Sequence, residues 1–152
     1  MKSRSESCVP QPADLRDRAL RLLARREHSR IELARKLEQA GFVGGDITPL
    51  LDAFEAQNWL SDRRFAESYV ADHRARAGGI KLAYDLRQRG VSDAIIDAVL
   101  GENRDSELDR ARAVWKKKFG SAPADMVERA RQIRFMQSRG FAPEVIRCAI
   151  ND

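Results

Sequence analysis

The side chains with the most evident chemistry in this sequence are positive charges that gather in one stretch. Between residues 110 and 139, nine Lys and Arg residues stand against two carboxylates, so this stretch carries +7 while the whole chain carries +5. Three of the nine are consecutive, Lys116 to Lys118, and on a helix their charges would spread over most of the circumference. Such a concentration predicts attraction to a polyanion or to an acidic protein surface. The alternative is a solvated helix face that is rich in arginine.

The sequence lacks the residue patterns of a typical catalytic or metal site. It has no GxSxG, P-loop, HExxH or glycine-rich nucleotide motif, and we interpret the phrase AGGIK as a turn. Cys8 and Cys148 form no CxxC pair, and His28 and His73 stand far apart. We therefore predict reduced thiols, no metal site, no cofactor and no enzyme activity.

A helical phrase that occurs three times would position the charges. ELARKLEQAGF, KLAYDLRQRGV and RQIRFMQSRGF contain Gly41, Gly90 and Gly140, which are 49 and 50 residues apart. The residues seven and four positions before each glycine, and one position after it, are apolar. This pattern predicts a buried stripe on each helix and a glycine stop in the left-handed conformation. The nine apolar residues are Ala34, Leu37, Phe42, Ala83, Leu86, Val91, Ile133, Met136 and Phe141.

Another helix follows each stop, and a third precedes each phrase. Ser92 and Pro143 suit the starts of the following helices in the second and third copies. In the first copy Thr48 and Pro49 suit the start, and the phrase VGGD adds about four residues to the turn. Ser29 and Asp125 are expected to cap the middle helices of the first and third copies. The preceding helices are expected at 15–26, 62–76 and 108–119.

These elements predict an all-α chain of three tandem three-helix repeats that form an elongated, curved array. We expect a disordered tail at residues 1–13 and repeats at 14–59, 60–104 and 105–152, with a polar joint at 101–107. Apolar residues make up 43% of the chain and aromatic residues only 7%, and no stretch alternates with a period of two. Apolar runs are too short to cross a membrane, and the start of the chain lacks an apolar signal core, so we expect a cytoplasmic protein.

The middle helix of each repeat is the best candidate for contact with a partner. Arg35, Tyr84 and Arg134 stand six positions before the three glycines, on the stripe that we expect to face outward. Solvated charge is the alternative interpretation of this stripe. The residues predicted to contact a partner are Arg25, Arg26, Arg30, Arg35, Lys36, Lys116, Lys117, Lys118, Arg131 and Arg134.

Several blocks together resemble the RecX family of bacterial regulatory proteins. They are ARREHSRIELARKL, LSDRRFAESYVADHR, GGIKLAYDLRQRGV, AVWKKKF and FMQSRGFAPEVIRCAI, and the stretch from Leu60 to Leu100 is the most specific. The resemblance implies an all-helical modulator that lies in the groove of the RecA filament on single-stranded DNA. It implies inhibition of ATP hydrolysis, strand exchange and co-protease activity. It implies the RecA filament as partner, with weak, nonspecific contact to the single strand, and we expect a monomer.

A helix-turn-helix transcription regulator is the alternative function, because 33–54 and 82–100 each join two helices through a turn. The second helices of these pairs read PLLDAFEAQ and DAIIDAVL. Their acidic and apolar side chains are poorly suited to hydrogen-bond base edges. This alternative predicts sequence-selective binding to duplex DNA in the absence of RecA, as a dimer.

Overall fold

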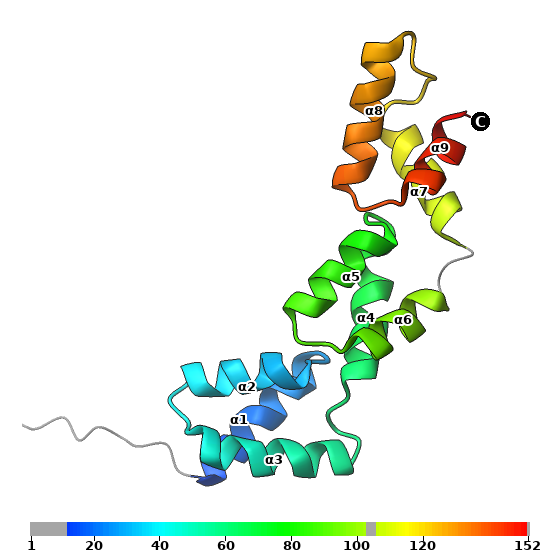
Figure 1. The fold of residues 1–152 in the computed structure, drawn as a ribbon. Helices are drawn as coiled ribbons and strands as arrows, with labels where there is room; N and C mark the ends of the chain where they lie inside the picture. Colours follow the sequence, from blue (N-terminus) through cyan, green and yellow to red (C-terminus); the bar gives the residue numbers. More distant parts are fainter. Residues whose placement is uncertain (1–11, 103–105, 152) are drawn as a thin grey trace, which may run out of the picture. The chain divides into compact units, whose positions relative to one another are not determined.

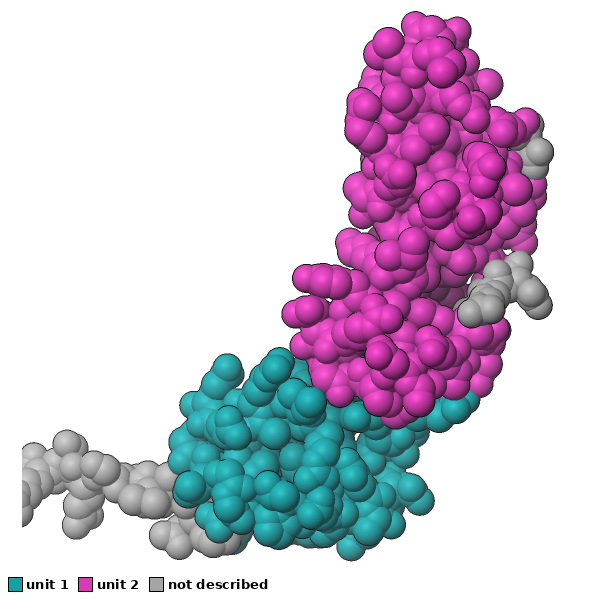
Figure 2. Space-filling model, in the orientation of Figure 1, with its two compact units in different colours: residues 1–65 teal, residues 66–152 magenta. Residues whose placement is uncertain are grey.

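The computed structural model describes residues 12–102 and 106–151, and every regular element in this part of the chain is an α-helix (Figure 1). The predicted all-α class is thus confirmed. The chain divides into two compact units, residues 1–65 and 66–152 (Figure 2). Helix α1 (Pro12–Arg25) begins within the predicted tail, whose residues 1–11 lie outside the described residues. The predicted joint at 101–107 is also only partly described, since residues 103–105 lie outside.

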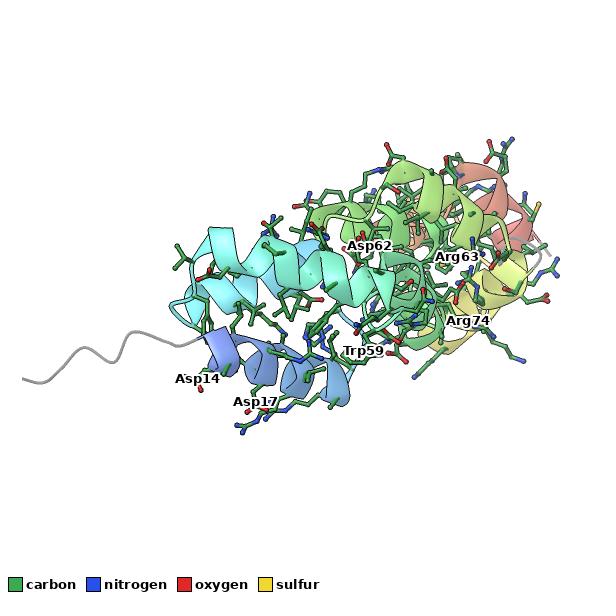
Figure 3. The ribbon with its side chains drawn as sticks, turned by 90° about the horizontal axis from the view of Figure 1, so that it is seen from below. Asp14, Asp17, Trp59, Asp62, Arg63 and Arg74 are labelled. Carbon is green, nitrogen blue, oxygen red and sulfur yellow. The ribbon has the colours of Figure 1, made fainter. Side chains whose placement is uncertain are left out.

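Unit 1 holds α1, α2 (Arg30–Gln39), α3 (Gly44–Ala56) and the start of α4 (Asp62–His73). The apolar faces of the first three helices converge on one core, to which the segment before α4 adds Leu60. Its buried members are Leu15, Ala19, Leu33, Leu37, Ile47, Leu51, Phe54 and Leu60. Trp59, labelled in Figure 3, packs against the ring of Phe54 with 5.5 Å between centroids, yet it remains 44% exposed.

Helix α3 begins four residues earlier than predicted. The expected start was Thr48-Pro49, but the helix begins at Gly44 and Pro49 lies inside it. The first turn is held by the carbonyl oxygen of Val43, which accepts from the amides of Asp46 and Ile47 at 3.0 and 3.1 Å. Because the helix begins at Gly44, Ile47 lies on its buried face in the core. The carbonyl that the ring of Pro49 would approach is that of Gly45, four residues earlier.

Unit 2 holds the rest of α4, α5 (Gly79–Gln88), α6 (Asp93–Gly101), α7 (Glu107–Lys118), α8 (Met126–Ser138) and α9 (Pro143–Asn151). Helices α7, α8 and α9 enclose a core of their own. Its buried members are Ala111, Met136, Phe141, Ile146, Ala149 and Ile150. The helix starts that we predicted at Ser92 and Pro143 are confirmed, because Ser92 caps α6 and Pro143 is the first residue of α9.

The three glycine stops are confirmed, and they share one geometry. Gly41, Gly90 and Gly140 have φ angles of 96°, 81° and 82°. After each glycine the amide of the apolar residue bonds back to the carbonyl five positions earlier, as Phe42 does to Leu37 at 3.1 Å. The glycine amide itself bonds to the carbonyl three positions earlier. These two bonds define the Schellman motif, which satisfies the last carbonyls of each middle helix.

The buried stripe of each middle helix is displaced by one residue from the predicted stripe. Positions four before each glycine are fully buried, as predicted. The second buried position, however, is eight before the glycine rather than seven, so Leu33 and Leu82 are buried while Ala34 and Ala83 are only half-buried. A spacing of four residues places both side chains nearly one above the other on the helix.

In the third repeat the same position is occupied by Gln132, which is 1% exposed. Its side-chain oxygen accepts a hydrogen bond from the indole nitrogen of Trp115 at 2.8 Å. Its amide nitrogen donates to the carbonyl of Ser121 at 3.3 Å and to the carboxylate of Glu128 at 3.4 Å. The third repeat therefore replaces a leucine contact with a satisfied polar network.

Replacing Gln132 with leucine is expected to destabilise unit 2 by about 1–3 kcal/mol, because the indole N–H of the partly buried Trp115 loses its acceptor. The double variant Trp115→Phe, Gln132→Leu removes both partners and is expected to recover most of this loss. Urea unfolding of the single and double variants by circular dichroism measures the coupling. Purely additive effects would show that the hydrogen bond does not contribute.

Within unit 2, the start of α5 docks directly onto the end of α8. The amide of Gly78 donates to the carbonyl of Arg139 at 2.7 Å, and the amide of Ile80 donates to the carbonyl of Gly140 at 3.0 Å. The amide of Gly79 donates to the carboxylate of Glu107 at 3.0 Å. The unpaired amides at the start of one helix thus satisfy the carbonyls at the end of another. The glycines that we interpreted as a turn form this junction between the second and third repeats.

Unit 1 contains a related contact. The amide of Arg30, the first residue of α2, donates to the carboxylate of Asp62 at 2.8 Å. Asp62, labelled in Figure 3, is the first residue of α4, as Glu107 is the first residue of α7. In both cases an acidic side chain at the start of a later helix caps the middle helix of the preceding repeat. A carboxylate is favourable at this place because it meets the positive end of the helix dipole.

Candidate binding surface

Two of the predicted contact residues, Arg26 and Arg30, are paired within unit 1. Arg26 makes a two-pronged contact with the carboxylate of Glu32, and its guanidinium also donates to the carbonyl of Glu27 at 2.9 Å. Arg30 forms ion pairs with Asp52 at 2.7 Å and with Glu55 at 3.2 Å. Because internal carboxylates already neutralise these guanidiniums, they offer little charge to a partner.

The Arg26–Glu32 pair controls the titration of the carboxylate. Burial alone would raise the pKa of Glu32, but the hydrogen bond and the charge of Arg26 outweigh it and lower the pKa below its ordinary value. The same hydrogen bond raises the pKa of Arg26 against the opposing effect of burial. The pair therefore stays ionised at neutral pH and fixes the segment between α1 and α2.

Lys36 is held by a buried histidine. The Nδ1 of His28 lies 3.0 Å from the carbonyl oxygen of Arg26, and its Nε2 lies 2.9 Å from the Nζ of Lys36. A carbonyl oxygen can only accept, so Nδ1 carries the proton and Nε2 accepts from the ammonium group. Burial lowers the pKa of His28 below its ordinary value. The hydrogen bond to the carbonyl of Arg26 opposes this shift, and the positive charges of Arg26 and Lys36 add to it.

We expect unit 1 to lose stability as the pH falls below about 6.5, the ordinary pKa of histidine. In this window the unfolded chain protonates His28 while the folded chain does not, so the unfolded state binds more protons and acid favours it. Urea unfolding between pH 7 and pH 5 measures the effect. His28→Phe should flatten this pH dependence, whereas His73→Gln, the matched control, should leave it. An unchanged slope in His28→Phe would contradict the assignment.

The other predicted residues on the middle helices lie on exposed faces. Arg35 and Arg134 are exposed six positions before their glycines, as is Tyr84 with 59% of its surface open, so the outward stripe that we predicted faces solvent. Arg131 is exposed and lies 3.5 Å from the carboxylate of Glu128. Arg25, at the end of α1, is also exposed.

Lys116, Lys117 and Lys118 form the exposed last turn of α7. Lys117 and Lys118 line a groove of about 400 Å³, and Lys116 does not. The lining residues are Ala75, Arg76, Ala113, Val114, Lys117, Lys118, Phe135 and Arg139. We call this feature the basic groove.

The basic groove contains two cations that the sequence did not assign to a site, Arg76 and Arg139. Arg76 lies beyond the end of α4, and Arg139 lies at the end of α8. Arg139 was counted within the basic stretch, but only the packing of α7 against α8 shows that it lies near Lys118. By contrast, Arg110 of the same basic stretch turns inward, and its guanidinium donates to the carbonyls of Arg74 and Ala77 at 2.9 and 3.3 Å.

Among residues 12–102 and 106–151, no three His, Cys, Asp or Glu side chains gather in a way that would hold a metal ion. Within the same residues, no helix has the length and apolar character needed to span a membrane.

Comparison with known proteins identifies the family. Models of the first, second and third three-helix domains of RecX match residues 16–52, 61–100 and 105–150. The chain is 46% identical over 136 residues to Regulatory protein RecX of Ralstonia nicotianae, covering 90% of this chain and 86% of that protein. It is 46% identical over 137 residues to Regulatory protein RecX of Halorhodospira halophila, covering 89% and 85%.

The fold is similar to that of solved structures. The crystal structure of RecX from Lactobacillus salivarius superposes with a TM-score of 0.81 at 19% identity, covering 92% of this chain and 94% of that one. A second crystal structure, of a regulatory protein RecX, gives a TM-score of 0.80 at 17% identity and covers 93% and 73%. With three matched three-helix domains and close relatives that share nearly its whole length, the chain belongs to the RecX family of regulatory proteins.

Proposed function

We propose that this protein binds the RecA filament on single-stranded DNA and inhibits its recombinase, ATPase and co-protease activities by occupying the filament groove. The observation that carries this proposal is membership of the RecX family across all three three-helix domains. The protein acts in this proposal as a cytoplasmic monomer, without a cofactor and without catalysis of its own. Its contact with the single strand is weak and nonspecific.

The repeated architecture gives a physical reason for this role. A filament presents the same surface at regular intervals, so successive similar repeats can each make a modest contact. Because the contacts are linked through one chain, each one raises the effective concentration of the next. Exposed cations such as Arg134 and Lys116 can meet acidic protein surface or phosphate, and this component weakens with salt.

The exposed faces of α3 and α6, the helices that would read bases in a helix-turn-helix regulator, favour the RecA proposal over a transcription regulator. In α3 the exposed side chains include Asp52 and Glu55, and in α6 they include Asp93 and Asp97. A recognition helix must bring donors and acceptors against base edges beside a dense array of phosphates. Carboxylates offer no hydrogen-bond donor to the acceptors on guanine and adenine edges. Three of the four are also engaged by arginines of this chain, Asp52 and Glu55 by Arg30 and Asp93 by Arg87. These positions therefore disfavour docking of either helix in the major groove.

A direct test measures ATP turnover by RecA on single-stranded DNA while the amount of this protein is increased. We expect turnover to fall and the protein to sediment with the filaments. The variant Lys116→Glu, Lys117→Glu is expected to bind at least about fivefold more weakly. The matched control Arg18→Glu, Arg21→Glu changes the net charge equally on the exposed face of α1 and is expected to bind nearly normally.

Circular dichroism of both variants checks that their helices remain intact. Unchanged ATP turnover together with no sedimentation of the unmodified protein would refute the proposal. Selective binding to one duplex sequence without RecA would support the transcription regulator instead.

A further inference from the structure

The basic groove combines a positive rim with an apolar floor. Its four charged side chains are Arg76, Lys117, Lys118 and Arg139. They come from the segment after α4, the last turn of α7 and the end of α8. Its other lining residues are Ala75, Ala113, Val114 and Phe135. A volume of about 400 Å³ falls within the range of pockets that hold small ligands or a few side chains.

Among the described residues, no carboxylate neutralises the rim charges of the basic groove. None of the described residues that line the groove is acidic, and none of the four cations forms an ion pair with a described carboxylate. Arg26 and Arg30 differ sharply, since carboxylates of unit 1 neutralise both. Four like charges around one groove repel each other, and an anion that entered would relieve this repulsion.

Two of the cations are already held in place by an aromatic ring. The Nζ of Lys118 lies 5.5 Å from the centroid of Phe135, and the guanidinium carbon of Arg139 lies 5.2 Å from it. Cation–π attraction restricts both side chains to the groove. An incoming anion therefore meets charges that have lost part of their conformational freedom before binding.

The floor indicates which kind of anion fits. Base stacking by single-stranded nucleic acid needs an open aromatic face, but the ring of Phe135 is occupied by cations and packs edge-on against Phe119, 5.4 Å away. The described residues that line the groove include no neutral polar side chain that could bond a base edge. The small apolar side chains of Ala75, Ala113 and Val114 favour contact with an aliphatic side chain instead.

We propose that the basic groove binds an acidic peptide segment in which carboxylates flank a bulky aliphatic side chain. The carboxylates pair with the four rim cations, and the aliphatic side chain covers Ala113 and Val114. This inference rests on the proposed function in one respect, because it names the kind of RecA surface, an acidic segment, that the basic groove would bind. The groove itself is tested without RecA.

The test uses a fluorescein-labelled peptide, Gly-Asp-Glu-Leu-Glu-Asp-Gly, titrated with the full chain and followed by fluorescence anisotropy. We expect saturable binding that weakens with salt. Replacing the leucine of the peptide by glycine is expected to weaken binding by about tenfold, since it removes the apolar contact. If the glycine peptide binds equally well, the apolar floor has no role and the proposal fails.

Single charge reversals locate the site. Lys117→Glu is expected to weaken binding at least about fivefold, whereas the matched control Arg147→Glu, exposed on α9 of the same unit and outside the groove, is expected to change it less than about twofold. If both charge reversals weakened peptide binding equally, the peptide would respond only to the overall charge of the protein, and the assignment of the site to the basic groove would be overturned. Ala113→Trp fills the floor from an exposed position and is expected to abolish binding with an unchanged unfolding midpoint.

A competing single strand distinguishes the two classes of polyanion. Unlabelled oligo(dT) of about 15 nucleotides is expected to displace the peptide poorly, and efficient displacement through the groove residues would assign the groove to nucleic acid. RecA ATP turnover measured with the same variants separates the two proposals. Peptide binding without any inhibition of RecA refutes only the proposed function. Full inhibition by a variant that no longer binds the peptide refutes only the groove as its contact.

Discussion

Replacing Gly140 with alanine is expected to lower the stability of unit 2 by about 2–5 kcal/mol. The first cause is backbone conformation, because φ at Gly140 is +82° and a side chain in this region costs about 1–2 kcal/mol. The second cause is the junction with α5. An alanine Cβ would lie 2.5 Å from the backbone nitrogen of Lys81, and overpacking against backbone costs about 1–3 kcal/mol.

Two matched variants separate these causes. Gly120 has a φ of +73°, and a Cβ there would meet only the carbonyl of Lys116 at 3.5 Å, so Gly120→Ala reports the conformational cost alone. Gly78 has an ordinary φ of −83°, but a Cβ there would lie 2.5 Å from the carbonyl oxygen of Gly140, so Gly78→Ala reports the clash alone. Urea unfolding in a Trp59→Phe background, followed by Trp115 fluorescence, measures all three. A loss in Gly140→Ala no larger than in Gly120→Ala would show that the junction does not form.

Replacing Leu86 with alanine is expected to cost about 2–5 kcal/mol. Leu86 is fully buried in α5 and accepts the returning amide of Val91 through its backbone at 3.1 Å. Truncation removes apolar contacts and leaves a cavity that the neighbouring helices fill only partly. This backbone hydrogen bond does not depend on the side chain of Leu86, so the loss of stability reports packing alone.

Ile80 on the same helix provides the control for this prediction, because it is 58% exposed. Ile80→Ala should change the free energy of unfolding by less than about 0.5 kcal/mol. Urea unfolding followed by far-ultraviolet circular dichroism compares the two variants. A near-zero loss in Leu86→Ala would mean that α5 turns a different face to the core.

The sequence predicted the helices and their ends because these depend on local chemistry. The stops at Gly41, Gly90 and Gly140 require a left-handed residue, and glycine adopts that conformation at the lowest cost. The caps at Ser29 and Asp125 bond to amides three residues away, at 3.1 and 2.8 Å. Signals of this kind are complete within a few residues, so no tertiary contact is needed to recognise them.

The remaining features depend on residues far apart in the sequence. The displaced stripe placed Gln132 in the core, where Trp115 and Ser121 satisfy it from outside its own helix. The true start of α3 depended on the burial of Ile47 rather than on the proline that suggested a later start. These outcomes follow from packing, which periodicity alone does not encode.

The predicted contact residues show the same limit. Positive charge was visible in the sequence, but its availability was not, since Arg30 is paired with carboxylates of α3 that lie more than twenty residues away. The basic groove joins Arg76 to Arg139 across most of unit 2. The elongated and curved arrangement of the repeats, their residue boundaries and the ten contact residues stay predictions.

The docking of α5 on α8 has a consequence for the order in which the chain matures during synthesis. The amides of Gly78 and Ile80 find their acceptors only at Arg139 and Gly140, which a ribosome adds some sixty residues later. Until then the second repeat emerges with its middle helix incompletely capped. We expect a chain truncated before Arg139 to be cleaved faster within the second repeat than the full chain, which limited proteolysis measures.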